Sequence, residues 1–128
     1  MPPRTSIYVE GFGHKNPIPA ACRVGNIVYS GSIQGTDPAT GGYGADLDAQ
    51  AALMFAHVKR IVEAAGGSPE NIVKMTVWLK DRGNRDAVNR EWLKMFPDPH
   101  SRPARHAIQS SLDGDKLVEC DFVAVLDA

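Results

Sequence analysis

Residues 46–79, DLDAQAALMFAHVKRIVEAAGGSPENIVKMTVWL, contain the change of hydrophobic period that decides the fold class. Up to Ala65, apolar residues recur at steps of three and four, which predicts one long amphipathic helix. Asp46 can cap its first turn, and Gly66-Gly67 can supply the left-handed backbone that ends it. Apolar and polar residues then alternate over 73–79, which predicts a strand.

The flanking segments add further strands and a second helix. Short runs rich in β-branched and aromatic residues predict strands at 7–9, 21–24, 26–31, 104–111 and 116–125. The second helix opens at Asn84 and is stopped by Pro97. The turn sequence Asp113-Gly114-Asp115 predicts a hairpin between the last two strands. These elements predict a single α+β domain over 1–128, with a mixed sheet covered by two helices on one face.

The second face of this sheet is predicted to be half polar and half apolar. In the last strand Glu119, Asp121, Val123 and Val125 alternate with the residues that face the helices. Such a face in a small domain predicts burial against another copy of the chain. We therefore expect an oligomer.

Composition excludes several classes of protein. The 128 residues include 14 basic and 15 acidic ones, interspersed along the chain, so neither a nucleic acid nor an anionic membrane is expected as a partner. Two distant cysteines and an N-terminus without an apolar signal core predict a reduced, cytoplasmic protein. No apolar run approaches the roughly 18 residues of a membrane span, and the four histidines lack the spacing of metal ligands.

A candidate anion-binding group lies in Ser101-Arg102-Pro103-Ala104-Arg105, at the entrance of a predicted strand. A guanidinium offers two parallel N–H donors to a carboxylate and stays charged at any working pH. Pro103 stiffens the backbone that leads into the strand. Glu119 follows Arg105 by fourteen residues. From the residues alone, the alternative interpretation is that Arg102 and Arg105 are solvated cations on the surface.

Eight segments together resemble the RidA or YjgF family of reactive intermediate deaminases, also called endoribonuclease L-PSP. In order, they are Asn26–Ile33, Asp37–Gly41, Gln50, Ala64–Ser68, Ile72–Asp81, Val88-Asn89, Pro103–Arg105 and Val118-Glu119. The resemblance implies a chorismate-mutase-like fold and a homotrimer, with a central barrel of sheets and clefts between subunits. It also implies hydrolysis of small carboxylated enamines and imines to 2-oxo acids and ammonia, without a cofactor.

The resemblance also implies roles for individual residues. Arg105 would bind the substrate carboxylate, and Asn89 would support the cleft. Ser30 and Glu119 would line the reacting end, with Glu119 holding the attacking water. Taken singly, a residue such as Ser30 is more often a strand-end hydroxyl bonded to backbone, and Trp92 at helical spacing is expected in the core.

Three departures from the family pattern bear on the site. Ile18 stands where the family usually has a tyrosine, and His106-Ala107 replaces a small hydroxyl or cysteine pair, so Ile18 and Ala107 would line the substrate pocket. The stretch from Arg105 to Glu119 is one residue shorter than usual. A one-residue change within a strand can change the face that a side chain occupies. The alternative is that the shorter stretch turns Glu119 away and leaves Asp121 or a backbone group near the cleft.

Two alternative functions remain open. One is a pathway deaminase of the 2-aminomuconate type, whose pocket around Ile18 and Ala107 would accept a larger or less polar acid. The other is a non-catalytic trimer that binds 2-oxo acids through Arg105. The neutral charge balance gives no support for an RNA-binding surface.

Overall fold

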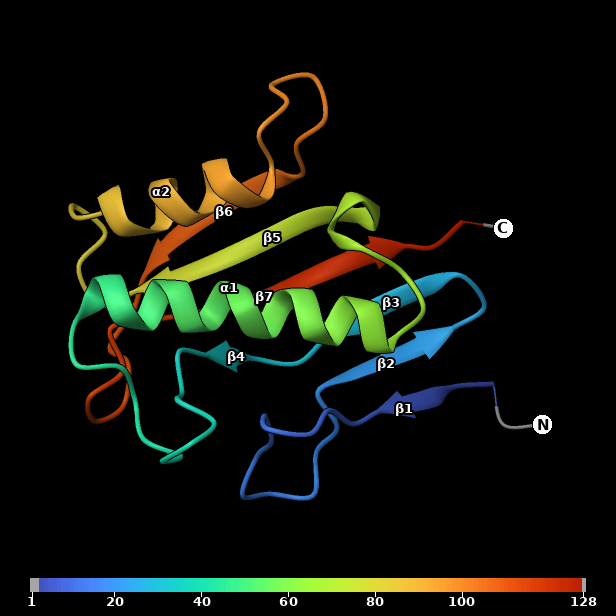
Figure 1. The fold of residues 1–128 in the computed structure, drawn as a ribbon, viewed down its shortest axis with the longest axis horizontal. Helices are drawn as coiled ribbons and strands as arrows, with labels where there is room; N and C mark the ends of the chain where they lie inside the picture. Colours follow the sequence, from blue (N-terminus) through green and yellow to red (C-terminus); the bar gives the residue numbers. More distant parts are fainter. Residues whose placement is uncertain (1–2, 128) are drawn as a thin grey trace.

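A mixed sheet organises residues 3–127, the part of the chain that the computed structural model describes (Figure 1). The strands are β1 (Thr5–Ile7), β2 (Ala21–Val24), β3 (Ile27–Ser30), β4 (Ile33–Gln34), β5 (Ile72–Leu79), β6 (Ala104–Gln109) and β7 (Val118–Val125). The helices are α1 (Leu47–Ala64) and α2 (Asp86–Met95), with a 3-10 turn, η1, at Pro69–Asn71. The spatial order is β1-β2-β3-β7-β5-β6, and β4 pairs with β7 on the edge that β3 also uses.

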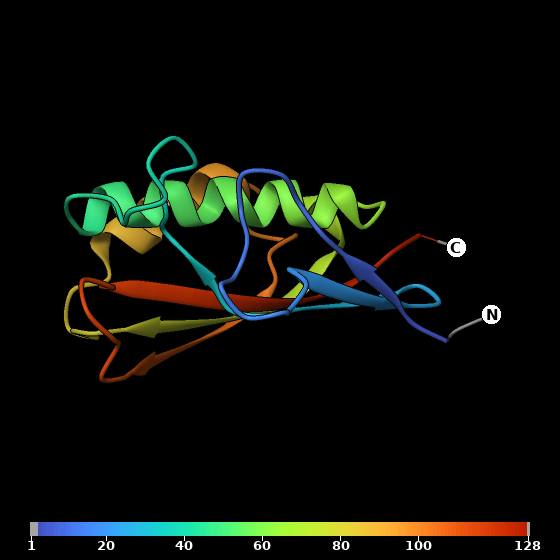
Figure 2. The same cartoon turned by 90° about the horizontal axis from the view of Figure 1, so that it is seen from below.

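Both helices lie on the same side of this sheet, as Figure 2 shows from below. The predicted α+β class and the covering of one face by two helices are therefore confirmed. The strands pair antiparallel, except that β5 and β6 run parallel. A parallel neighbour requires a crossover, and α2 provides it between β5 and β6.

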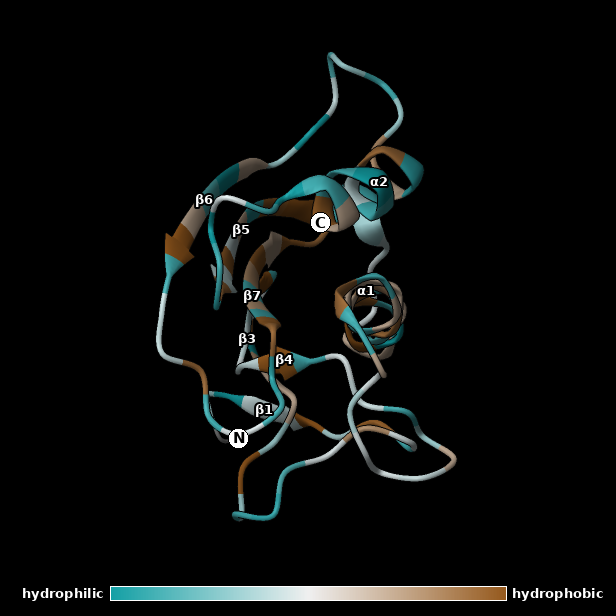
Figure 3. Cartoon of the chain, turned by 90° about the vertical axis from the view of Figure 1, so that its left-hand side faces the viewer, coloured by the Kyte–Doolittle hydropathy of each residue, from teal (hydrophilic) through white to brown (hydrophobic). Residues whose placement is uncertain are grey.

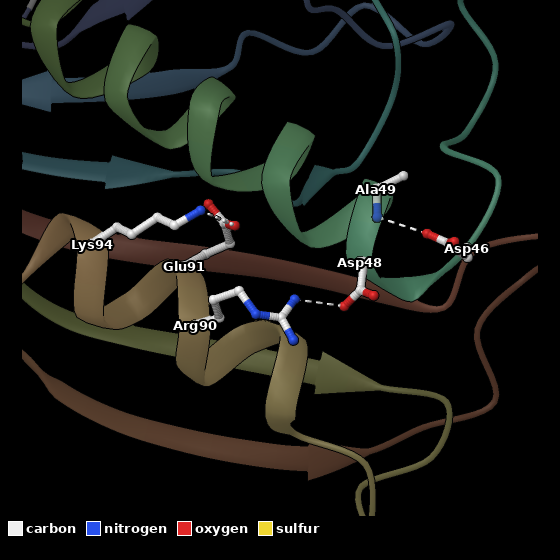
Figure 4. Close-up of polar contacts among 6 residues, drawn as sticks. All are labelled: Asp46, Asp48, Ala49, Arg90, Glu91 and Lys94. Atoms are coloured by element: carbon white, nitrogen blue, oxygen red, sulfur yellow. Dashed lines mark hydrogen bonds and ion pairs between the residues drawn. The ribbon is translucent and has the colours of Figure 1, made fainter.

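The long helix α1 forms as its sequence predicts. The carboxylate of Asp46 accepts a hydrogen bond of 2.8 Å from the backbone N–H of Ala49 (Figure 4), and Gly66 takes a φ of +102° just beyond the helix. Its apolar stripe is buried against the sheet, with Met54 and Val58 at 0% exposure. Each such side chain contributes about 1.5–3 kcal/mol when it leaves water.

The predicted hairpin between the last two strands is wrong. β6 and β7 do not pair, because β5 lies between them: Met75 is opposite Arg105 on one side and Phe122 on the other. The turn does form, with Gly114 at a φ of +57°, but it belongs to a connection that passes over the end of β5. β5 has buried apolar side chains, and it pairs with β6 along one edge and with β7 along the other. A hairpin of β6 with β7 would have left an edge of β5 unpaired.

Smaller differences concern the ends of elements. The first strand covers Thr5–Ile7 rather than 7–9, and Val9 forms only an isolated bridge with Phe12. The two-residue β4 is too short to produce a period and was not predicted. The second helix begins at Asp86, because Asn84 is held in a preceding turn by a backbone bond to Asp81.

The sheet face away from the helices, which we call the open face, is bare in the single chain (Figure 3). Register places Ile27 beside Val125 and Tyr29 beside Val123 on it. These side chains form an apolar patch, and Tyr29 is 61% exposed. The patch agrees with the expectation of burial against another copy, which stays a prediction.

Candidate functional site

Arg105 lies on the edge strand β6 and points beneath α2. Its Nη2 donates a hydrogen bond of 2.8 Å to Oδ1 of Asn89, and its Cζ lies 5.0 Å from the centre of the Trp92 ring. Asn89 and Trp92 are three residues apart on α2 and therefore project from the same side of the helix. The structure thus brings together Arg105 and Asn89, two of the predicted site residues.

The Arg105 guanidinium has no ion pair with a carboxylate among residues 3–127. Its Nη1 is buried and finds no hydrogen-bond partner there. Burial lowers the pKa of Arg105, and the nearby positive charge of Arg85 lowers it further. A half-buried cation beside a second cation is stabilised by an anion, so this arrangement favours carboxylate binding.

Arg102 differs from Arg105 and serves the fold. Its Nε donates to the backbone oxygen of Phe96 at 2.8 Å, and its Nη2 donates to that of Pro97 at 3.2 Å. A cation at the end of α2 also interacts favourably with the helix dipole. The interpretation as a surface cation therefore fits Arg102 but not Arg105.

Glu119 lies on the open face, in the middle of the sheet, opposite Trp78 on β5. Its Oε1 lies 3.9 Å from Nζ of Lys116, and the two side chains are only 16% and 19% exposed. Asp121 lies on the same face and accepts a hydrogen bond of 3.2 Å from Nε1 of Trp78. A single chain therefore places Arg105 and Glu119 on opposite sides of its sheet.

Ser30 has a structural role in the single chain. Its Oγ donates to the backbone oxygen of Gly31 and accepts from the backbone N–H of Phe122, both at 2.8 Å. The hydroxyl thus links β3 to β7 where their backbone ladder ends. Ile18 is 46% exposed on the loop before β2, and Ala107 follows Arg105 by two residues on the same face of β6.

A buried histidine in α1 was missed by sequence reasoning, because one histidine among apolar residues carries no spacing signal. Nε2 of His57 lies 2.7 Å from the backbone oxygen of Thr36, so Nε2 carries the proton and donates it. Its Nδ1 is buried without a partner in the described chain. The ring packs against Phe12, and the two contacts hold two loops against α1.

The structure predicts an acid-sensitive fold through His57. Burial lowers the pKa of His57 below its ordinary 6.5, so the unfolded chain takes up a proton at a higher pH than the folded protein does. The contribution of neutral His57 to the free energy of unfolding is therefore fully present above pH 6.5, and it is expected to be lost as the pH drops through the lowered folded pKa. Thermal unfolding at several pH values between 8 and 5 measures this, with His57→Asn as the control. An equally steep loss of melting temperature in that variant would contradict the assignment.

A surface cavity of ≈ 360 Å³ lies beside the end of α2 and the start of β5, and Met95, Phe96 and Arg102 are among its lining residues. Its lining includes neither Arg105 nor Glu119. The cavity is therefore not the predicted site.

Comparison with known proteins decides the family. The profile described as Endoribonuclease L-PSP matches residues 12–126. The chain belongs to this family. A 2-iminobutanoate/2-iminopropanoate deaminase of Salmonella typhimurium is 37% identical over 101 residues, which are 77% of this chain and 78% of that protein.

Solved structures of the L-PSP family superpose closely on the chain. RidA of an Antarctic Psychrobacter species does so with a TM-score of 0.88 and 31% identity, over 95% of this chain and 99% of that one. Escherichia coli TdcF with bound serine has a TM-score of 0.87 and 29% identity, over 96% and 99%. The predicted membership of the RidA or YjgF family and its fold are confirmed.

Two classes of feature are absent from the part of the L-PSP domain that the structure describes. No three His, Cys, Asp or Glu side chains of residues 3–127 converge as metal ligands. No helix in the same range is long and apolar enough to cross a bilayer.

Proposed function

We propose that the protein hydrolyses small 2-imino acids and their enamine tautomers to 2-oxo acids and ammonia. The observation that carries this proposal is the Arg105 guanidinium, which Asn89 and Trp92 hold and which has no carboxylate partner among the described residues. The bidentate fork of an arginine matches the carboxylate of such substrates. The deaminase name of the Salmonella relative supports the imine chemistry.

The reaction requires that the substrate and the attacking water are held in position, and it requires one group that can accept a proton and return it. Arg105 holds the carboxylate, and water adds to C2 of the protonated imine while Glu119 takes a proton from that water. The electron pair of the C–N π bond moves to nitrogen, which gives a carbinolamine. Glu119 returns its proton to nitrogen, the C–N bond breaks to release ammonia, and the hydroxyl proton passes to solvent as the carbonyl forms.

This chemistry requires Arg105 and Glu119 at one site, although one chain places them on opposite sides of its sheet. We therefore propose that the site forms between copies of the chain, where the open face of one meets the β6 edge of the next. The apolar patch around Tyr29 would be buried by the same contact. A homotrimer satisfies both requirements by closing in a ring.

A trimer is expected in solution, with a mass three times the 13.8 kDa of the chain. Light scattering at micromolar concentration measures it. Tyr29→Lys should shift the distribution towards smaller particles, because a charge on the open face opposes burial. A wild-type particle of 13.8 kDa would contradict the intersubunit site.

The activity is tested by generating 2-iminopropanoate or 2-iminobutanoate in situ and following its conversion with and without the protein. Semicarbazide traps the imine faster than it traps the 2-oxo acid, so an active protein, which removes the imine, lowers the initial rate of semicarbazone formation. Arg105→Ala should behave as the sample without protein. Equal initial rates with and without wild-type protein would contradict the proposal.

Two other functions give different outcomes in this assay. A deaminase for a larger acid is favoured by the replacement of the usual tyrosine by Ile18 and by the small Ala107, and it would turn over longer imino acids faster. A non-catalytic binder of 2-oxo acids would bind pyruvate but leave the initial rate of semicarbazone formation unchanged.

A further inference from the structure

The Trp92 ring contacts an aromatic ring on one side and a cation on another. A residue that served the core alone would not need the contact with the cation. On one side its ring meets the Phe96 ring edge-on, with centroids 4.7 Å apart and an interplanar angle of 65°. On another, it lies under the guanidinium of Arg105. The sequence indicates a core residue, and Trp92 does pack against the core while remaining half-buried.

The guanidinium needs such a contact because little else fixes it. An arginine side chain has several rotatable bonds, and no strand among residues 3–127 pairs with the outer edge of β6. Asn89 fixes only Nη2, and the charge of Arg85 is repulsive. The Trp92 ring, over which Cζ lies, is therefore the other attractive contact of the guanidinium. Tryptophan is the aromatic residue that attracts cations most strongly.

We propose that Trp92 is the positioning residue of the carboxylate site: its indole face holds the Arg105 guanidinium in the plane in which the fork meets a substrate carboxylate edge-on. This inference rests on the proposed function, since it assumes that Arg105 binds the substrate. Trp92 touches the arginine and not the reacting atoms, so it acts on binding and not on the chemical step.

The placement of α2 comes from its buried face rather than from its surface charges. Ala87 and Val88 are 3% and 1% exposed. The ion pair between Arg90 and Asp48 joins α2 to α1 at 2.8 Å, but these side chains are 53% and 65% exposed (Figure 4). Such pairs add little to stability, so the buried Ala87 and Val88 are the residues expected to hold α2 when Trp92 is replaced.

Binding and kinetics of three variants test the inference. Trp92→Leu keeps apolar bulk without a π face and should raise the KM for the imino acid and the Kd for pyruvate by about tenfold, with kcat changed less than about twofold. Trp92→Tyr should restore most of this loss. Leu93→Ala is the matched control, because its side chain is 53% exposed on the same helix and should leave both constants unchanged.

Fluorescence tests the same contact without relying on a truncated side chain. The chain has two tryptophans, Trp78 on the open face and Trp92. Titration with pyruvate should change the emission of the Trp78→Phe protein, in which only Trp92 emits. The change should disappear when Arg105→Ala is added to Trp78→Phe, because that protein keeps Trp92 but lacks the guanidinium.

The outcomes separate this inference from the proposed function. Wild-type KM and Kd in Trp92→Leu, beside a loss of binding in Arg105→Lys, would overturn the role of Trp92 and leave the carboxylate site in place. A Trp78→Phe protein that binds pyruvate without any change of emission would overturn it as well. Unchanged pyruvate binding in Arg105→Lys would instead overturn the proposed site.

Discussion

Replacing Arg105 by lysine is expected to weaken pyruvate binding nearly as much as replacing it by alanine, by about one to two orders of magnitude. A lysine ammonium keeps the charge but lacks a planar fork. It cannot give two parallel N–H donors to a carboxylate while it also bonds Asn89 and stacks on Trp92. Titration calorimetry with pyruvate measures the affinity.

Arg102→Lys is the matched control for this experiment. Arg102 precedes the same strand but donates to the backbone oxygens of Phe96 and Pro97, so it should bind pyruvate as the wild type does. If Arg105→Lys also binds as the wild type does, Arg105 is an ordinary cation and the anion site lies elsewhere.

Glu119→Gln is expected to lower turnover by a factor of about 10² or more while leaving pyruvate binding largely intact. The amide keeps the shape of the side chain but cannot accept the proton of the attacking water. The coupled assay with an imino acid generated in situ measures turnover, and calorimetry measures binding. A fall in turnover without a fall in affinity would separate chemistry from recognition.

Asp121→Asn distinguishes the two carboxylates of the open face. Asp121 accepts a hydrogen bond from Nε1 of Trp78, whereas the polar contact of the Glu119 side chain within residues 3–127 is the longer one with Lys116. We therefore expect turnover close to that of the wild type in Asp121→Asn. Full activity in Glu119→Gln beside a loss in Asp121→Asn would reverse the assignment.

The sequence predicts best the elements in which apolar residues recur regularly over a long stretch of chain. The stripe of α1, its cap at Asp46 and its end at Gly66 all lie within one stretch of chain, and each forms as expected. The pairing of β6 and β7 failed because it depends on what lies between them in space. A good turn at Gly114 says that the chain reverses but not how many strands it crosses.

Residues of the candidate site could be predicted from the sequence where the residue type itself carries the chemistry. Arg105 follows from its fork and its place at a strand entrance, and its partner Asn89 followed from the resemblance. Trp92 could not be distinguished from a core residue, because the same helical spacing serves both roles. The positions of Arg105 and Glu119 on opposite sides of the sheet depend on the crossover through α2, which no local pattern encodes.

The central place of β7 in the sheet has a consequence for biosynthesis. Residues 118–125 come last among the strands, yet β3 and β4 hold one of their edges and β5 holds the other. Until a ribosome has made this segment, the nascent chain carries two amphipathic fragments that share no strand. Their apolar surfaces are then open to self-association, and such intermediates are clients of chaperones. Folding is therefore expected to begin only after synthesis of the final strand, in one cooperative step that joins both fragments.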